Sequence, residues 1–185
     1  MAQEKPKALL VIFTGVEEVE AVTPIDLLRR AGIEVTVASL GVEKAIVGRN
    51  NIVLTADTDL ATVMARPFDV LVLPGGPGVR LLRGEPTVIE MVEHQAASGR
   101  LVAAICAAPT VLKDAGVLLG RSFTAHPSVE DELPELRKSK AVVRDGNVIT
   151  SRGAGTAIPF ALEIIRALVS DAKATEVAAA ICYPR

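Results

Sequence analysis

The sequence is poor in aromatic residues and has no excess of one charge. Aromatic residues make up 3% of the 185 residues, with no Trp and a single Tyr, so platforms on which bases or sugars stack are hard to build. Lys and Arg number 20 against 22 Asp and Glu, and no long block of like charge occurs. Because nucleic-acid binding depends on a basic surface, we expect no nucleic-acid partner.

Long hydrophobic runs and paired cysteines are also missing. No apolar stretch approaches the ~18 residues of a membrane-spanning helix. The first apolar run is too short for a signal peptide, and the acidic Glu17, Glu18 and Glu20 follow it at once. We therefore expect no membrane association and a cytoplasmic location. In that compartment Cys106 and Cys182, which lie far apart in the chain, should remain reduced thiols.

Hydrophobic residues, mostly Val, Ile, Leu and Ala, make up 50% of the chain, which is typical of parallel strands buried on both faces. Continuous or alternating apolar runs predict strands, and apolar residues at helical spacing, bounded by Pro or Gly, predict helices. The expected strands are 8–13, 33–40, 68–73 and 101–105. The expected helices are one that Gly32 ends, then 86–97, 107–115, 159–168 and 172–180.

Two further segments predict hairpins, 41–54 with its Gly and Asn residues and 141–150 with Asp145-Gly146 between apolar triplets. No repeat or linker divides the chain, so we expect one domain over 1–185. It should be an α/β domain with a mostly parallel central sheet and helices on both faces. Ligands bind such sheets outside the carboxyl ends of the strands. The loops expected there are 14–20, 74–78, 106–109, 124–127 and 151–156.

Cys106 ends the last of these core strands and is the leading candidate for a reactive group. It follows five apolar residues and precedes Ala107, Ala108 and Pro109. A free cysteine in such a place is usually a buried structural residue. A position just before a helix, however, predicts a reactive thiol with a low pKa, because the helix dipole favours the anion. The turn is similar to the nucleophile elbow of hydrolases, although the elbow's glycines are missing.

Two other loops carry groups that could serve this thiol. Of Glu17, Glu18 and Glu20, two are explained as helix caps or partners of the helix dipole. A third, held protonated beside an anionic sulfur, could donate a hydrogen bond or carry a proton. Gly75 and Gly76 are either a tight exit from a strand or a pair of backbone donors for a developing oxyanion.

The histidines and the second cysteine are open to plainer interpretations. His126 follows a short strand and could overhang the same edge of the sheet, or serve only a structural role. His94 lies mid-helix beside Glu93 and is expected to face solvent. Cys182, close to the end of the chain, should have a packing or surface role.

Five separate motifs, in order along the chain, resemble the ThiJ/PfpI superfamily and more closely its branch of Parkinsonism-associated protein deglycases. The motifs are Gly15–Glu20, Leu73–Gly76, Ala103–Thr110, Thr124–Pro127 and Thr150–Thr156. The resemblance implies a flavodoxin-like sandwich, a homodimer, and Cys106 as a nucleophile that can oxidise to a sulfinate. It also implies Glu20 as the protonated carboxyl at the thiol, with His126 close by.

The same resemblance suggests which groups surround the thiol. Backbone donors would come from Gly75, Gly76 and Ala107. The candidates for anion contacts or contacts across a dimer are Arg29, Arg30 and Arg152.

Three positions depart from the family or separate its branches. Ala108 stands where Gly is common, and Pro77 offers no side-chain amide after the glycine pair. Protease-like members carry His directly after the cysteine, whereas this chain has Ala107, so a Cys-His protease dyad is not expected. Cysteine and glutamate alone suit chemistry on small carbonyls, in which a thiolate adds to an aldehyde.

The sequence therefore predicts a cofactor-independent glyoxalase or deglycase that acts on glyoxal, methylglyoxal or their adducts through Cys106, with Glu20 carrying the proton. No cluster with metal-ligand spacing is evident, so no metal is expected. The alternatives are a redox sensor or redox-regulated chaperone, a thiol peptidase, and a scaffold with an inert cysteine.

Overall fold

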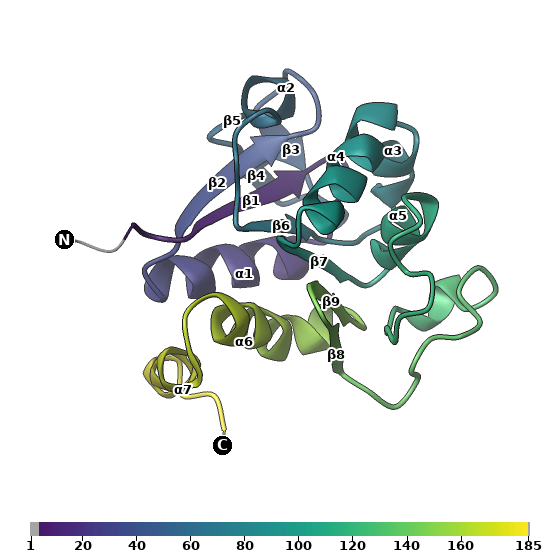
Figure 1. The fold of residues 1–185 in the computed structure, drawn as a ribbon. Helices are drawn as coiled ribbons and strands as arrows, with labels where there is room; N and C mark the ends of the chain where they lie inside the picture. The colour runs from purple at the N-terminus through teal and green to yellow at the C-terminus, as the bar shows by residue number, and fades with distance from the viewer. Residues whose placement is uncertain (1–3, 185) are drawn as a thin grey trace.

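The computed structural model describes residues 4–184 and has a seven-stranded sheet at its centre (Figure 1). Neighbouring strands in the sheet are parallel except β8, which pairs antiparallel with β9. The order is β5 (Thr58–Asp59), β2 (Glu34–Ser39), β1 (Lys7–Ile12), β6 (Val70–Leu73), β7 (Leu101–Ile105), β9 (Val148–Ser151) and β8 (Val142–Asp145). The expected core strands are confirmed, with shifts only at their ends.

Helices cover both faces of the sheet, as the alternation of strands and helices predicts (Figure 1). One face carries α1 (Glu18–Arg30), α6 (Ala157–Leu168) and, packed on α6, α7 (Asp171–Ala180). The other carries α2 (Leu60–Val63), α3 (Val79–Arg83), α4 (Pro86–Ala97) and α5 (Pro109–Asp114). Because both faces are covered, every residue of β6 and β7 is buried, which explains their uninterrupted apolar sequences.

Both expected hairpins are present. β3 (Ala45–Val47) and β4 (Val53–Thr55) form a separate antiparallel pair, and β8 and β9 are joined by a tight turn at Gly146, whose φ is 59°. The short elements α2, α3 and β5 and the 3₁₀ turns 127–129 and 154–156 have no counterpart in the sequence-based expectations. Elements of two to five residues contain too few positions for a hydrophobic period to be recognised.

The five loops expected at the carboxyl edge of the sheet do converge there. The Glu17 N–H donates to the Gly75 carbonyl at 2.9 Å. The Cys106 N–H donates to the Ser151 carbonyl at 2.9 Å, and the His126 N–H donates to the Cys106 carbonyl at 2.8 Å. Backbone hydrogen bonds thus tie together loops that lie far apart in the sequence. Within residues 4–184, no helix is both long enough and apolar enough to cross a membrane.

Candidate functional site

Cys106 occupies a strained turn between β7 and α5. Its φ is 65°, in the left-handed region that costs an L-residue other than glycine about 1–2 kcal/mol. The hydrogen bonds to Ser151 and from His126 hold its peptide groups on both sides. Such strain persists only where the surrounding structure fixes it, and it gathers at functional sites. The turn leaves Cys106 half-buried and not sealed within the core.

Glu20 is the carboxyl that reaches this thiol. It lies in the first turn of α1 and is 1% exposed. Its Oε2 accepts the Gly75 N–H at 2.8 Å, and its carboxyl also hydrogen-bonds the Cys106 side chain. Gly75 lies between the two groups: a Cβ there would come 2.5 Å from the Cys106 Cβ and 2.7 Å from Oε2 of Glu20. Glycine is therefore required at 75 by close packing.

Burial raises the pKa of Glu20 to about 7, against the opposing effect of the hydrogen bonds from Gly75 and Cys106. Removing a carboxyl from water disfavours its charged form, and the two donors recover only part of that loss. A carboxyl with this pKa carries a proton in a large share of molecules at neutral pH. Glu20 is therefore the one of the three glutamates that can hold a proton beside the thiol, as the sequence-based argument requires.

The expectation of a low thiol pKa is wrong for Cys106 beside an ionised Glu20. Burial, followed by the charge and hydrogen bond of Glu20, raises the pKa of Cys106 to about 12. The helix that should favour the anion, α5, has six residues and begins only at Pro109. The backbone N–H groups of Gly76 and Ala107 act in the expected direction and lower the pKa, but they do not overcome burial.

Cys106 and Glu20 are best described as one coupled pair. A proton on Glu20 removes the negative charge that opposes the thiolate and supplies a donor to the sulfur. Ionisation of Cys106 is then tied to protonation of Glu20. The expected backbone donors divide accordingly: Gly76 and Ala107 serve the sulfur, whereas the Gly75 N–H is occupied by Glu20 and is not available to an oxyanion.

Neither Glu17 nor Glu18 caps α1 with its side chain, although Glu18 lies in the first turn, where a carboxylate complements the helix dipole. Although burial opposes it, the pKa of Glu18 is lowered, because its carboxylate accepts hydrogen bonds from the Asn50 N–H at 2.7 Å, the Asn50 side chain at 3.0 Å and the Ile52 N–H at 3.4 Å. Glu17 is an N-cap residue without a side-chain cap and instead pairs with Arg49 at 3.3 Å. Both carboxylates fasten the β3–β4 hairpin to the start of the helix that carries Glu20.

His126 lies at the same edge of the sheet but does not bond the thiol. Its Nδ1 accepts the Ser128 N–H at 3.1 Å and lies 2.8 Å from Ser128 Oγ. A neutral ring therefore carries its proton on Nε2. The ring carbon Cδ2 and Oε1 of Glu20 flank Gly153, where an added Cβ would be 3.3 Å and 3.8 Å from them. His126 is thus both a cap of a 3₁₀ turn and a neighbour of the site.

Of the candidate arginines, only Arg152 lies at this edge within the chain. It is half-buried and directly follows β9. Arg29 and Arg30 lie in the last turn of α1, at the opposite end of the helix from Glu20, and pair with Asp57 and Asp26. A contact from either of them across a dimer stays a prediction. His94 and Cys182 are both exposed, as expected for a solvent-facing histidine and a surface cysteine.

Two contacts of the site were not anticipated. Gly76, with φ of 110°, leaves no room for a Cβ, which would come 2.5 Å from the Gly15 carbonyl oxygen. The anchoring of Glu18 by Asn50 joins the site to a hairpin 32 residues further along the chain. The sequence signal for this contact is a Gly-Arg-Asn-Asn turn, which lies far along the chain from the three glutamates. Within the described residues, no group of three or more His, Cys, Asp or Glu could hold a metal ion.

These features define a class: a flavodoxin-like α/β protein that presents a cysteine at a strand-to-helix turn against a buried, protonatable carboxyl. The chain belongs to the DJ-1/PfpI family, whose model matches residues 6–167. Its relatives place it with the DJ-1 branch, as the motifs indicate. Protein dj-1beta of Drosophila melanogaster is 45% identical over 175 residues, covering 92% of this chain and 94% of that one.

Two further relatives and two solved structures extend the comparison. Parkinson disease protein 7 homolog of Danio rerio is 40% identical and covers 94% of this chain and 95% of its own. Glutathione-independent glyoxalase DJR-1.2 of Caenorhabditis elegans is 34% identical over both chains in full. The crystal structure of Drosophila melanogaster DJ-1beta has a TM-score of 0.95 at 42% identity, covering 98% of this chain and 100% of that one. Oxidized Toxoplasma gondii DJ-1 has a TM-score of 0.93 at 33% identity, covering 97% and 100%.

Proposed function

We propose that this protein is a cofactor-independent glyoxalase and deglycase that acts on small reactive carbonyls through Cys106, with Glu20 carrying protons. The observation that supports it most is the contact between the Cys106 side chain and a carboxyl that is 1% exposed and has its pKa raised to about 7. A group that titrates near neutral pH is suited to general acid–base work. One relative along the whole chain is named a glutathione-independent glyoxalase.

The reaction uses the coupled pair directly. Glu20 takes the thiol proton as the sulfur adds to the aldehyde carbon of methylglyoxal, and returns it to the carbonyl oxygen, which gives a hemithioacetal. Glu20 then moves the proton from the former aldehyde carbon to the neighbouring carbonyl carbon, and the hydroxyl proton of the hemithioacetal passes to the oxygen on that second carbon, which leaves a thioester. Water cleaves the carbon–sulfur bond, releasing lactate and the free thiol. The oxidation of one carbon balances the reduction of the other, so no external oxidant or reductant is consumed.

Deglycase activity follows from the same attack. When methylglyoxal is held as an adduct on an amine or thiol, Cys106 bonds to the adduct carbon as its bond to that nitrogen or sulfur breaks. Glu20 passes the thiol proton of Cys106 to the departing amine or thiol. Hydrolysis at Cys106 then proceeds as for the free aldehyde. The N–H groups of Gly76 and Ala107, which favour the anionic sulfur, stabilise it as attacking and leaving group.

The test is turnover of methylglyoxal to lactate by the wild type and the Cys106→Ser variant, with Cys182→Ser as the matched control. Loss of the nucleophile should lower kcat at least about a thousand-fold, and Cys182→Ser should leave it unchanged. Glu20→Gln should lower kcat by about 10²–10⁴. Full activity in Cys106→Ser would sink the proposal, and cleavage of peptide amides in preference to methylglyoxal would favour a thiol peptidase.

A second candidate function is redox sensing at the same sulfur, alone or as a redox-regulated chaperone. A solved relative is described as an oxidized DJ-1. Peroxide oxidises the thiolate first to a sulfenate and then to a sulfinate, each step releasing water. A protonated Glu20 and the nearby N–H groups offer donors to the sulfinate oxygens. Peptide mass mapping should find two added oxygens on Cys106 and none on Cys182, and the reverse pattern would contradict this candidate.

We also propose that the protein forms a homodimer through α1 and the β3–β4 hairpin. These adjacent elements expose a group of apolar side chains, and exposed apolar patches mark protein–protein contact surfaces. The side chains are Val19, Val22, Val47, Ile52 and Val53, between 44% and 56% exposed. Light scattering should give a dimer mass for the wild type and a monomer mass for Val22→Glu. Val42→Glu, at a loop position that is 85% exposed, is the control and should remain dimeric; a monomeric wild type would refute the assignment.

A further inference from the structure

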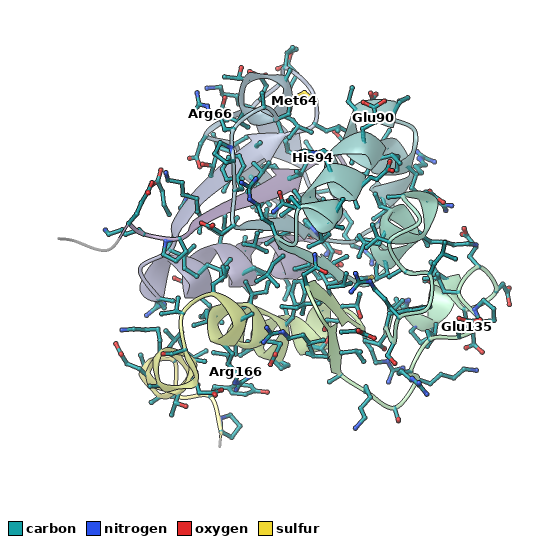
Figure 2. All side chains as sticks on the ribbon, in the orientation of Figure 1. Met64, Arg66, Glu90, His94, Glu135 and Arg166 are labelled. Atoms are coloured by element: carbon teal, nitrogen blue, oxygen red, sulfur yellow. The ribbon has the colours of Figure 1, made fainter. Side chains whose placement is uncertain are left out.

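A small cavity of about 190 Å³ lies at the edge of the sheet opposite to Cys106. Arg100, which lines it, immediately precedes β7, whereas Cys106 follows that strand. Phe68 precedes β6, whereas Gly75 follows it. In Figure 2 the labelled side chains of Met64, after α2, and His94, on α4, lie on the same side of the molecule as Arg66. The cavity is thus separate from the candidate active site.

The floor of this cavity is apolar. Leu9 and Leu71 are each 2% exposed and Phe68 is 8% exposed, so the cavity reaches side chains of the hydrophobic core. Met64 and Met91 form part of the wall, and their flexible thioethers adapt to the shape of an apolar guest. Contact with this floor would take apolar surface of a ligand out of water, which is favourable in proportion to the area buried.

The rim of the cavity carries two arginines and a histidine, without acidic partners. Arg66, His94 and Arg100 line the cavity, and no Asp or Glu from residues 4–184 does so. Neither arginine forms an ion pair within the described chain. Arg83, by contrast, is paired with both Asp114 and Glu132. Two guanidinium groups over an apolar floor favour a ligand with one anionic end.

The cavity is held in shape by Gln95, which is 8% exposed. Its Nε2 donates to the Phe68 carbonyl at 3.0 Å and to the Leu101 carbonyl at 3.3 Å. These bonds tie α4 to the segments that lead into β6 and β7. A ligand entering a cavity that is already formed spends little of its binding energy on ordering the protein.

We propose that this cavity binds a small carboxylate with a short apolar tail, the carboxylate at Arg66 and Arg100 and the tail against Leu9, Phe68 and Leu71. The volume corresponds to about six water molecules at ~30 Å³ each, which fits a chain of about six carbons and excludes long fatty acids. Charge complementarity selects the carboxylate, and the core side chains select the tail.

The test titrates the isotope-labelled full chain with hexanoate while amide NMR spectra are recorded, and repeats the titration with hexylamine and acetate. Hexanoate should give saturable shifts confined to residues 64–71 and 91–101, with a Kd of about a millimolar, the strength typical of so few ligand atoms. Hexylamine, with the same tail and the opposite charge, and acetate, with no tail, should each bind at least about tenfold more weakly. Equal response to hexanoate and hexylamine would overturn the proposal, as would shifts that do not saturate.

Two variants separate the charge from the cavity. Arg66→Gln/Arg100→Gln should weaken hexanoate at least about tenfold, whereas Arg80→Gln, an exposed arginine on α3 outside the cavity, should leave the Kd unchanged. Met91→Trp, which fills the cavity and keeps both arginines, should also abolish binding. Native-like spectra of the free variants confirm that they fold. Undiminished binding in either cavity variant would contradict the assignment.

Discussion

Cys106 and Cys182 share a backbone conformation that few residues other than glycine adopt, with φ of 65° and 55°, but for different reasons. Cys182 follows α7 and ends it in the usual way: its N–H donates to the Ala179 carbonyl, and the Tyr183 N–H to the Ala178 carbonyl, which is the Schellman pattern. Cys106 lies between a strand and a helix and is held by hydrogen bonds to other loops.

The surroundings of the two cysteines differ more than their backbones. Cys182 is exposed at the surface, whereas Cys106 is half-buried against a carboxyl with a raised pKa. Left-handed geometry alone therefore does not mark a functional cysteine. What distinguishes Cys106 is that distant segments converge to impose the geometry and to supply Glu20. The predictions below disturb those segments or compare the two cysteines directly.

Among changes to the residues that surround the pair, the largest effect is expected from Gly75→Ala. The added Cβ would come 2.5 Å from the Cys106 Cβ, 2.7 Å from Glu20 Oε2 and 2.9 Å from the Ile105 carbonyl oxygen, so the pair must separate. Displacement of about 1 Å at a reacting group lowers activity about a hundredfold or more. The loss is measured as the rate of methylglyoxal turnover. Gly155→Ala is the control, because a Cβ at Gly155 meets nothing within 4 Å. Equal activity in the two variants would show that the contact between Cys106 and Glu20 is dispensable.

The next effect is a pH dependence of stability that Glu20 alone contributes. The pKa of Glu20 is raised from 4.5 to about 7 in the folded state, so the folded chain holds this proton more tightly than the unfolded chain. The stabilisation is complete below pH 4.5 and is lost as the pH rises through about 7. A pKa shift of this size corresponds to about 3 kcal/mol of unfolding free energy.

Urea denaturation of the wild type and Glu20→Gln at several pH values isolates that contribution, because titrating groups that do not interact with Glu20 cancel in the difference. Relative to Glu20→Gln, the wild type should lose about 3 kcal/mol of unfolding free energy between pH 4 and pH 8. A difference that is flat, or that rises with pH, would mean that Glu20 is ionised throughout and that Cys106 has no protonated neighbour.

A smaller effect is expected from Glu18→Gln, which weakens the attachment of the β3–β4 hairpin to the start of the helix that carries Glu20. The Glu18 carboxylate binds Asn50 and Ile52 of the hairpin turn, and replacing one oxygen by an amide leaves a buried donor facing other donors. The loss should be about 1–3 kcal/mol of unfolding free energy, with faster hydrogen exchange at the Asn50 and Ile52 amides. Unchanged exchange at both amides would show that the hairpin is held by other contacts.

How far the sequence anticipates this molecule depends on the range of the interaction. Strands such as 101–105 and the β8–β9 hairpin follow from local patterns, because apolar runs and Asp-Gly turns act within a few residues. The topological rule then brings Cys106 and the glutamates to one edge. The choice of Glu20 among three neighbouring glutamates follows only from the family resemblance, because it depends on burial and on partners such as Gly75. The sign of the thiol pKa shift likewise depends on burial, which local sequence does not contain.

The smallest effect, and the one that separates the two cysteines most cleanly, is expected from Cys182→Gly. Because the left-handed position after a helix favours glycine, relief of backbone strain should stabilise the protein by up to about 1 kcal/mol, less the greater freedom of glycine in the unfolded chain. Cys106→Gly obtains the same relief but leaves a void beside Glu20 and removes a hydrogen-bond partner of that buried carboxyl, so it should not be stabilised. Thermal unfolding of both variants measures the contrast. The opposite result, in which Cys106→Gly is more stable than the wild type and Cys182→Gly is less stable, would contradict this account. It would mean that packing holds the surface cysteine and not the half-buried one.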